Sequence, residues 1–264
     1  GYDVKRELLK RGVSEENILA VDKDEMDITN RDEVDKVVTG FNPDIVFHCA
    51  AWTAVDKAED AEDACYNVNV VGTKNVVDAS IEVGATTIYM STDYVFDGTK
   101  EGLYTEEDRR NPKPLITRIS WVFGINGHNF IRTMLKLSDN HSELNVVDDQ
   151  IGSPTYTVDL AKTLVDMSNS DKYGTYNVTN SDYCSWAEFA EYIFESNKKR
   201  VKVNKVTTEE YLELTGTKQA YRPRNSKLDK SKLEENFELL PTWKDAVNRY
   251  NVELEEEKKL VKKI

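Results

Sequence analysis

Apolar positions along the chain fall into short continuous runs and into longer stretches with helical spacing. The continuous runs, which predict buried strands, lie at about residues 18–21, 44–50, 87–91, 115–123, 144–147, 175–178 and 201–203. Helical spacing is found at about residues 2–11, 31–38, 62–84, 129–137, 158–167 and 186–194. Strands that alternate with helices in this way are typical of an α/β fold with a doubly wound parallel sheet of the Rossmann type.

Polar side chains at three positions predict where helices begin. Ser185 is the expected N-cap of the helix at 186–194, and Glu188 three residues later completes a capping box. Thr29 is the expected cap of the helix at 31–38. Thr242 is expected to cap a last helix, which leads into a charged tail from Glu253.

Two parts of the predicted fold are not found in the sequence. A Rossmann-type fold begins with a strand whose turn into the first helix carries a glycine-rich phosphate cradle, and only Gly1 stands before the first helix here. The connection between Phe96 and Leu115 has no helical pattern, although parallel strands are usually joined through a helix. The simplest interpretation is that residues are absent between about Asn111 and Leu115, and a true deletion is the alternative.

Composition narrows the class of function. The net charge of −13 argues against a nucleic-acid-binding protein, because phosphate contacts need clustered Lys and Arg. The three cysteines are isolated and the three histidines lie far apart, so we expect no metal site. No signal peptide and no apolar run of about 18 residues is found, and we expect a cytoplasmic protein without a membrane span.

Small or polar residues follow three of the predicted strands. The first group is Cys49 to Asp56, the second is Ser91 to Phe96, and the third is Trp121 to Gly124. The carboxyl ends of parallel strands meet at one edge of a sheet, where α/β enzymes bind ligands. A flat cofactor can pass close to small residues there, although tight packing of helix on sheet is an equal alternative for the first group.

Several single residues fit chemistry at that edge. Thr92 can donate a hydrogen bond to a substrate carbonyl, with a simple turn after the strand as the alternative. Asp22 can accept hydrogen bonds from the adenosine ribose of NAD, with an ordinary turn residue at a strand end as the alternative, whereas Lys23 can pair with the 2′-phosphate of NADP. Asn69, among valines, either steadies the backbone of the site or only joins two elements. Trp121 is either a wall of the site or a core residue.

These segments together resemble the extended short-chain dehydrogenase/reductases, and in particular the dTDP-4-dehydrorhamnose reductase family. The resemblance covers nearly the whole chain, and its most specific parts are residues 49–56, 91–98, 118–124 and 149–155. It implies an oxidoreductase of dTDP-rhamnose biosynthesis. Such an enzyme uses NADPH or NADH to reduce the C4 keto group of dTDP-4-dehydro-6-deoxy-L-mannose, also called dTDP-4-dehydrorhamnose. A homodimer is left open.

The resemblance also implies roles for single residues and a division into domains. Residues 1–124 with about 144–170 would form the dinucleotide-binding domain, and about 125–143 with 171–264 a smaller α/β domain for the sugar nucleotide. Thr92 would be the hydroxyl of the catalytic triad, and Asp93 and Trp121 would contact the substrate with it. The cofactor would lie along Gly1, Asp22, Asp27, Ile28, Ala50, Ala51, Trp52 and Thr53.

One catalytic motif of this family is absent from the sequence. The family's proton donor is a Tyr with Lys four residues later, and none of the thirteen tyrosines here has Lys at that position. The motif belongs before the strand at Leu115, where the missing helix is also expected. A true loss would favour a non-catalytic regulatory subunit, like the beta subunit of methionine adenosyltransferase. Another nucleotide-sugar reductase or epimerase is the third alternative.

Overall fold

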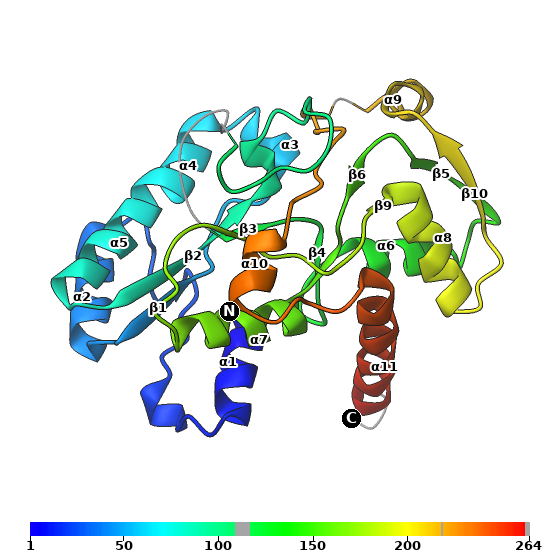
Figure 1. Cartoon of the computed structure of the whole chain (residues 1–264). Coiled ribbons are helices and arrows are strands. Elements are labelled where there is room, and N and C mark those ends of the chain that lie inside the picture. Colours follow the sequence, from blue (N-terminus) through cyan, green and yellow to red (C-terminus); the bar gives the residue numbers. More distant parts are fainter. Residues whose placement is uncertain (109–116, 218, 262–264) are drawn as a thin grey trace.

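A parallel sheet forms the centre of the molecule in the computed structural model, which describes residues 1–108, 117–217 and 219–261 (Figure 1). Its strands are β1 (Ile45–His48), β2 (Thr86–Thr92), β3 (Thr117–Ile119) and β8 (Tyr176–Asn177), in the order β1-β2-β3-β8. Every neighbouring pair is parallel. The sheet confirms the predicted α/β class.

Helices cover both faces of this sheet. α2 (Arg31–Phe41) packs on α5 (Thr73–Glu82) at one face, and α1 (Tyr2–Lys10) packs on α7 (Thr157–Ser168) at the other (Figure 1). Successive side chains of a strand therefore point to opposite faces of the sheet. In β1, Val46 packs with the α2–α5 cluster, whereas Ile45 and Phe47 pack with the α1–α7 cluster. Both faces of the sheet are thus buried, as in other parallel sheets.

A second group of elements lies beside the sheet. β5 (Glu143–Val147) pairs in parallel with β10 (Lys202–Val206), and α8 (Trp186–Ser196) packs against both. The core of this group contains Phe123, Ile131, Phe189 and Tyr250. The remaining elements here are α6 (Phe130–Leu137), α9 (Thr208–Thr215), α11 (Trp243–Val261), β4 (Val122–Phe123), β7 (Thr155–Tyr156), β6 (Ile151–Gly152) and β9 (Cys184–Ser185).

Strand pairing bears on where the two domains divide. The sequence puts the strand near Leu144 with the dinucleotide-binding domain, but β5 pairs with β10 in the second group. It puts residues 171–178 with the smaller domain, but β8 pairs with β3 in the main sheet. The division stays a prediction, but the strand pairing places β5 with the second group of elements and β8 with the main sheet.

Residues 62–82 form one helical stretch, close to the helix predicted over 62–84. It consists of α4 (Glu62–Tyr66), the π-helical turn η2 (Asn67–Gly72) and α5. Short elements complete the chain: η1 (Glu15–Asn17), α3 (Val55–Ala58), η3 (Asp93–Val95) and α10 (Ser231–Asn236). A π-helical turn inside a helix is rare and is often found at functional sites.

Three predictions of local structure are wrong. Residues 18–21 form no strand, because no other strand of the described residues pairs with them and a strand needs a hydrogen-bonded partner. The cap of α2 is Asn30 rather than Thr29, since the Asn30 side chain accepts the hydrogen bond from Asp32 N. The strand expected over 115–123 is divided into β3 and β4 at Trp121, and its first two residues lie outside the described part.

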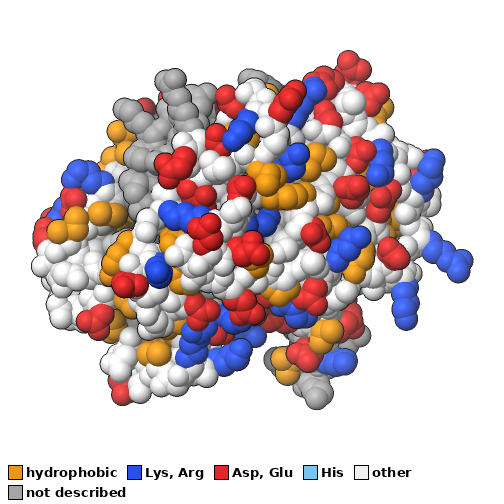
Figure 2. Space-filling view, in the orientation of Figure 1, with side chains coloured by type: hydrophobic (Ala, Val, Ile, Leu, Met, Phe, Trp, Pro, Cys, Tyr) orange, Lys and Arg blue, Asp and Glu red, His pale blue; other side chains and the backbone are white. Residues whose placement is uncertain are grey.

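Two predicted caps are confirmed. Ser185 and Glu188 form both hydrogen bonds of a capping box, and Thr242 Oγ1 accepts from Asp245 N at the start of α11. The helix α9 was not predicted, although Thr207 and Glu210 form a second capping box at its start. Carboxylates and cationic side chains are interspersed over the face in Figure 2. No helix in the described ranges combines the length and apolar character needed to cross a bilayer.

Candidate functional site

The residues expected to act together follow neighbouring strands at one edge of the main sheet. β1 and β2 are in register from Ile45 with Thr86 to His48 with Tyr89, so the loop Ala50–Thr53 leaves the sheet beside the end of β2. Thr92, which ends β2, is paired with Ile119 at the end of β3, and Trp121 follows two residues later. We call Ala50–Thr53, Thr92, Asp93 and Trp121 the carboxyl-edge site.

The loop Ala50–Thr53 is exposed but fixed. Ala50, Ala51 and Thr53 are exposed, which leaves a small-residue surface on which a flat ligand can lie. The amide of Asn69 in η2 accepts from Trp52 N at 2.8 Å and donates to Trp52 O at 3.4 Å. Of the two functions considered for Asn69, the structure favours steadying the backbone of the site.

The same π-helical turn also holds the segment with Asp27 and Ile28. Ile28 is buried, and a Cβ at Gly72 would lie 2.7 Å from its side chain, so this close packing requires glycine. Ile28 O accepts a hydrogen bond from Asn75 Nδ2 at 2.9 Å. The Asp27 carboxylate accepts from Thr29 N and Thr29 Oγ1, and these bonds lower the pKa of Asp27. η2 therefore supports two of the segments expected to hold the cofactor.

Thr92 and Asp93 form a hydrogen-bonded pair. Thr92 is exposed, and its hydroxyl donates to Asp93 Oδ1 at 3.1 Å while accepting from Tyr94 N at 3.2 Å. Asp93 is buried, and burial raises its pKa to about 6, against hydrogen bonds from Ser226 and Thr92 that lower it. Asp93 Oδ2 is buried without a hydrogen-bond partner.

Trp121 has a left-handed backbone conformation, and its ring packs against Trp186 and Gly152. Its φ of 47° is left-handed, which is uncommon for a bulky residue. Its ring stacks on Trp186 with centroids 3.7 Å apart, and a Cβ on Gly152 would lie 2.8 Å from the ring. The half-buried indole thus forms a rigid wall between the main sheet and the second group of elements.

The structure does not bring every expected cofactor residue to this edge. Asp22 is exposed in a turn, where its Oδ1 accepts from Lys23 N. The Lys23 side chain is 79% exposed, with Nζ 4.0 Å from Asp27 Oδ2. Gly1 precedes α1, and its carbonyl accepts a hydrogen bond from Lys5 N at 3.0 Å. The expected Tyr-x-x-x-Lys region around 111–115 lies outside the described residues.

A segment that no sequence pattern predicted crosses the site. It consists of residues 219–229, which we call the strap. It runs from α9 to α10 and passes beside α3 (Figure 1). Its Ser226 is buried against Asp93, and Pro223 packs on Gly98, whose φ of 75° and close contact both require glycine. Asn225 forms a parallel bridge with Ile151.

His48 is a buried histidine below the site. Its Nε2 lies 3.0 Å from Thr73 Oγ1, and its ring stacks on Tyr89 with centroids 5.3 Å apart. Burial lowers the pKa of His48 to about 4, so the imidazole is neutral at physiological pH. No group of three His, Cys, Asp or Glu placed to hold a metal ion is found in the described ranges.

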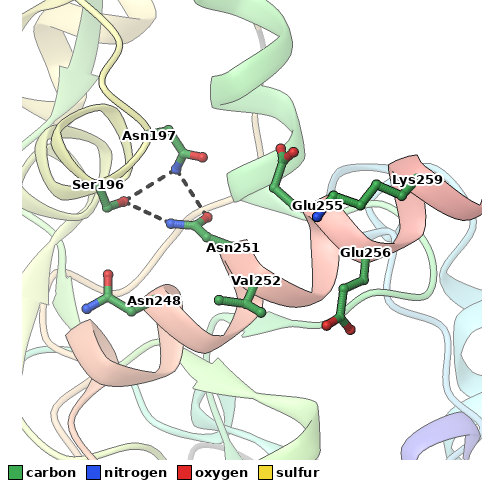
Figure 3. A pocket seen from close by; sticks show the side chains of 8 residues that line it. All are labelled: Ser196, Asn197, Asn248, Asn251, Val252, Glu255, Glu256 and Lys259. Atoms are coloured by element: carbon green, nitrogen blue, oxygen red, sulfur yellow. Dashed lines mark hydrogen bonds between the residues drawn. The ribbon is translucent and has the colours of Figure 1, made fainter.

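A separate surface groove of about 480 Å³ lies between α8 and α11 (Figure 3). Its wall carries a hydrogen-bonded set in which Asn197 Nδ2 donates to Asn251 Oδ1 and Asn251 Nδ2 donates to Ser196 Oγ. The groove shares no residue with the carboxyl-edge site.

Comparison with known proteins decides the family. The family model described as "RmlD substrate binding domain" matches residues 2–115 and 111–255. The curated dTDP-4-dehydrorhamnose reductase of Aggregatibacter actinomycetemcomitans is 38% identical, with 87% of this chain and 88% of the relative aligned. The chain belongs to the dTDP-4-dehydrorhamnose reductase family. This result confirms the resemblance derived from the sequence motifs.

Solved structures agree with this assignment. A dTDP-4-dehydrorhamnose reductase from Bacillus anthracis, solved in complex with NADP, superposes with a TM-score of 0.88 at 37% identity. The superposition covers 96% of this chain and 95% of that one. The spore coat polysaccharide biosynthesis protein SpsK of Bacillus subtilis is also 37% identical, over 95% of this chain and 92% of its own.

The alignments also bear on the missing helix. The two matched pieces of the family model meet at residues 111–115, where the sequence lacks the expected helix. The alignment to the Aggregatibacter reductase runs over 263 positions but includes only 87% of this chain's 264 residues, so part of the relative has no counterpart here. The junction of the two matched pieces favours residues absent from this position.

Proposed function

We propose that this protein reduces dTDP-4-dehydrorhamnose to dTDP-L-rhamnose with NADPH, and that the carboxyl-edge site performs the reaction. The observation that carries the proposal is the position of Thr92, whose exposed hydroxyl ends β2 beside the exposed loop Ala50–Thr53. A nicotinamide on that loop and a sugar carbonyl at Thr92 would be adjacent. Family membership supplies the substrate and the reaction type.

The residues present fit part of a dinucleotide. Ala50 and Ala51 have no side chain beyond Cβ and lie exposed, and Asn69 keeps their loop in one conformation. Ile28 lies against the same turn η2, and Asp27 and Ile28 would border the adenine.

We favour NADPH over NADH for two reasons. A relative was solved with NADP, and Lys23 extends into solvent beside the segment that would border the adenine. The Asp22 carboxylate accepts a hydrogen bond from the backbone of Lys23 and forms part of a turn. A cationic Lys23 can pair with a 2′-phosphate, which NADH lacks.

Each residue of the site then has a physical task. Bound NADPH supplies the hydride that adds to C4 of the sugar. Thr92 is placed to donate a hydrogen bond to the C4 oxygen, where negative charge develops. To do so its hydroxyl must turn away from Asp93 Oδ1, which accepts that proton in the structure. Asp93 therefore holds Thr92 in place until substrate competes for the hydroxyl.

The second group of elements would hold the sugar nucleotide. Trp121 presents a rigid indole two residues after Ile119, the partner of Thr92 in the sheet, and the loop from Asp149 to Thr155 lies at the same junction. We propose that the main sheet with α1, α2, α5 and α7 is the dinucleotide unit, and that β5, β10 and the helices around them are the substrate unit. The homodimer stays a prediction, which light scattering on the purified protein would test.

None of the described residues of the carboxyl-edge site is an evident donor of the proton that completes the reduction. Tyr94 is the phenol next to Asp93, but burial and the Asp93 charge both raise its pKa, which makes it a weaker acid. No Tyr in the sequence has Lys four residues later. A true loss of the motif would favour a second candidate function, a non-catalytic subunit that binds the same two ligands.

One experiment separates the two functions. The protein is mixed with NADPH and dTDP-4-dehydrorhamnose while NADPH absorbance is followed and the nucleotide products are resolved by chromatography. A reductase consumes NADPH in step with formation of dTDP-rhamnose. Binding of NADPH and dTDP in calorimetry without any NADPH consumption would establish the non-catalytic alternative.

A further inference from the structure

The strap contacts three segments that come from different parts of the chain. It contacts α3 through Asp56, the loop after β2 through Gly98, and the strand β6 through Ile151. Asn225 Nδ2 also donates to the carbonyls of Lys100 and Gly102, both at 2.7 Å. α3 and the loop after β2 belong to the proposed dinucleotide unit, whereas β6 borders the substrate unit.

Asp56 makes the connection nearest to the cofactor loop. It lies three residues after Thr53, and its two carboxylate oxygens hold the strap at two points. Oδ1 accepts from Ala220 N at 2.9 Å, and Oδ2 pairs with Arg222 Nη2 at 3.1 Å. Any shift of the Ala50–Thr53 loop that moves Asp56 is therefore transmitted to the strap.

The ion pair between Asp56 and Arg222 is weak enough to break without unfolding the protein. The Arg222 and Asp56 side chains are 32% and 47% exposed, and ion pairs at such exposure contribute little to stability. The strap's other contacts, at Gly98, Ile151 and Asp93, bury Pro223 and Ser226. Loss of Asp56 should thus free one end of the strap without unfolding the protein.

We propose that Asp56 is a positioning residue that couples cofactor binding to sugar-nucleotide binding through Arg222 and Ala220 of the strap. The inference rests on the proposed function, since it takes the two ligands from there. A cofactor that lies on the Ala50–Thr53 loop bears on Asp56, which follows three residues later, and Asp56 holds the strap over Asp93 and the junction with the substrate unit. The same link works in reverse, because binding coupling is reciprocal.

The test measures coupling rather than turnover. The affinity of NADP⁺ is measured by calorimetry with and without saturating dTDP, and the affinity of dTDP with and without NADP⁺. In the wild type, each ligand is expected to tighten the other by about fivefold or more, in the usual range of coupling between sites. Asp56→Asn keeps an oxygen for Ala220 N but loses the charge that Arg222 pairs with. It should lower the coupling toward none and change each single-ligand affinity by less than about twofold.

Further variants complete a double-mutant cycle of Asp56 and Arg222 and provide a control. Arg222→Gln should give the same loss, and the double variant Asp56→Asn with Arg222→Gln should lose no more than either single one. Asp60→Asn removes an exposed carboxylate four residues away and should leave coupling unchanged. Thermal unfolding of every variant should stay close to that of the wild type.

The outcomes are distinguishable. Wild-type coupling that persists in Asp56→Asn and in Arg222→Gln overturns the inference, as does a wild type that binds both ligands independently. A wild type that binds neither NADP⁺ nor dTDP overturns the proposed function itself, and this inference falls with it.

Discussion

The side-chain amide of Asn69 holds both backbone polar groups of Trp52, accepting from its N–H at 2.8 Å and donating to its carbonyl at 3.4 Å. Asn69 lies in the π-helical turn η2, whose last residue, Gly72, packs on Ile28. One irregular turn thus positions two segments that we assign to the cofactor. The irregular backbone of η2 therefore sets the positions of Trp52 and Ile28.

Replacement of Asn69 by Ala should weaken cofactor binding more than it weakens the fold. Two hydrogen bonds to Trp52 are lost, which costs about 1–2 kcal/mol in half-buried surroundings. We expect NADPH affinity to fall about tenfold, measured by fluorescence titration. Asn67→Ala, an exposed residue of the same turn, is the control. Equal NADPH affinity in Asn69→Ala and the wild type would show that the loop needs no support from η2.

The stability of the protein should depend on the titration of Asp93. Its pKa is raised from 3.8 to about 6, so the folded state binds more protons than the unfolded state between these values. Stability from this group is therefore full below about pH 4 and falls as pH rises through about 6, by up to roughly 3 kcal/mol. Asp93→Asn removes this dependence.

The measurement is urea unfolding of the wild type and Asp93→Asn at several pH values between about 4 and 8. The difference in unfolding free energy should move in favour of the variant as pH rises. His48, whose pKa is lowered to about 4, acts in the opposite direction, but it titrates in both proteins and cancels in the difference. A difference that is constant with pH would mean that Asp93 titrates normally.

Gly152→Ala should displace Trp121. The added Cβ would lie 2.8 Å from the indole, and Trp121 cannot move without losing its stack on Trp186. Overpacking of this kind costs about 1–3 kcal/mol. We expect a lower unfolding midpoint and weaker dTDP-sugar binding, with NADPH binding retained. Gly40→Ala is the control. Gly40 lies in α2, and no atom lies within 4 Å of an added Cβ, so this variant should be neutral or stabilising. Normal dTDP-sugar affinity in Gly152→Ala would remove Trp121 from the substrate site.

Thr92→Val should separate chemistry from binding. The substitution keeps the shape of the side chain and removes the hydroxyl at the end of β2. Loss of one donor at a developing oxyanion lowers kcat by about 10²-fold, while NADPH affinity should not change. Thr92→Ser should recover most of the rate in the same assay. A fully active Thr92→Val enzyme would exclude the hydroxyl from the reaction.

The sequence predicted most elements that have a strong local signal. The Ser185 capping box and the apolar stripe of α7 involve residues close in the chain, and both are confirmed. Residues 18–21 failed because a strand depends on a partner strand, which a local pattern cannot supply. The break at Trp121 arises from its left-handed backbone, which its residue type does not indicate.

The site was predictable to the extent that it follows strand ends. Residues 50–53 and Thr92 were placed together by the parallel order of β1 and β2 alone. The strap was missed because residues 219–229 have no periodic pattern, and several of their contacts join positions more than a hundred residues apart, as between Ala220 and Asp56. The roles of the single site residues stay predictions until the variants are measured.

The most direct test of the account is the yield of dTDP-rhamnose per NADPH oxidised by the purified protein acting on dTDP-4-dehydrorhamnose. The account predicts one product molecule for each NADPH consumed, with the rate lost in Thr92→Val. Calorimetric binding of NADPH and dTDP with no NADPH oxidation, in the presence of the keto-sugar, would contradict it and establish a binding subunit instead.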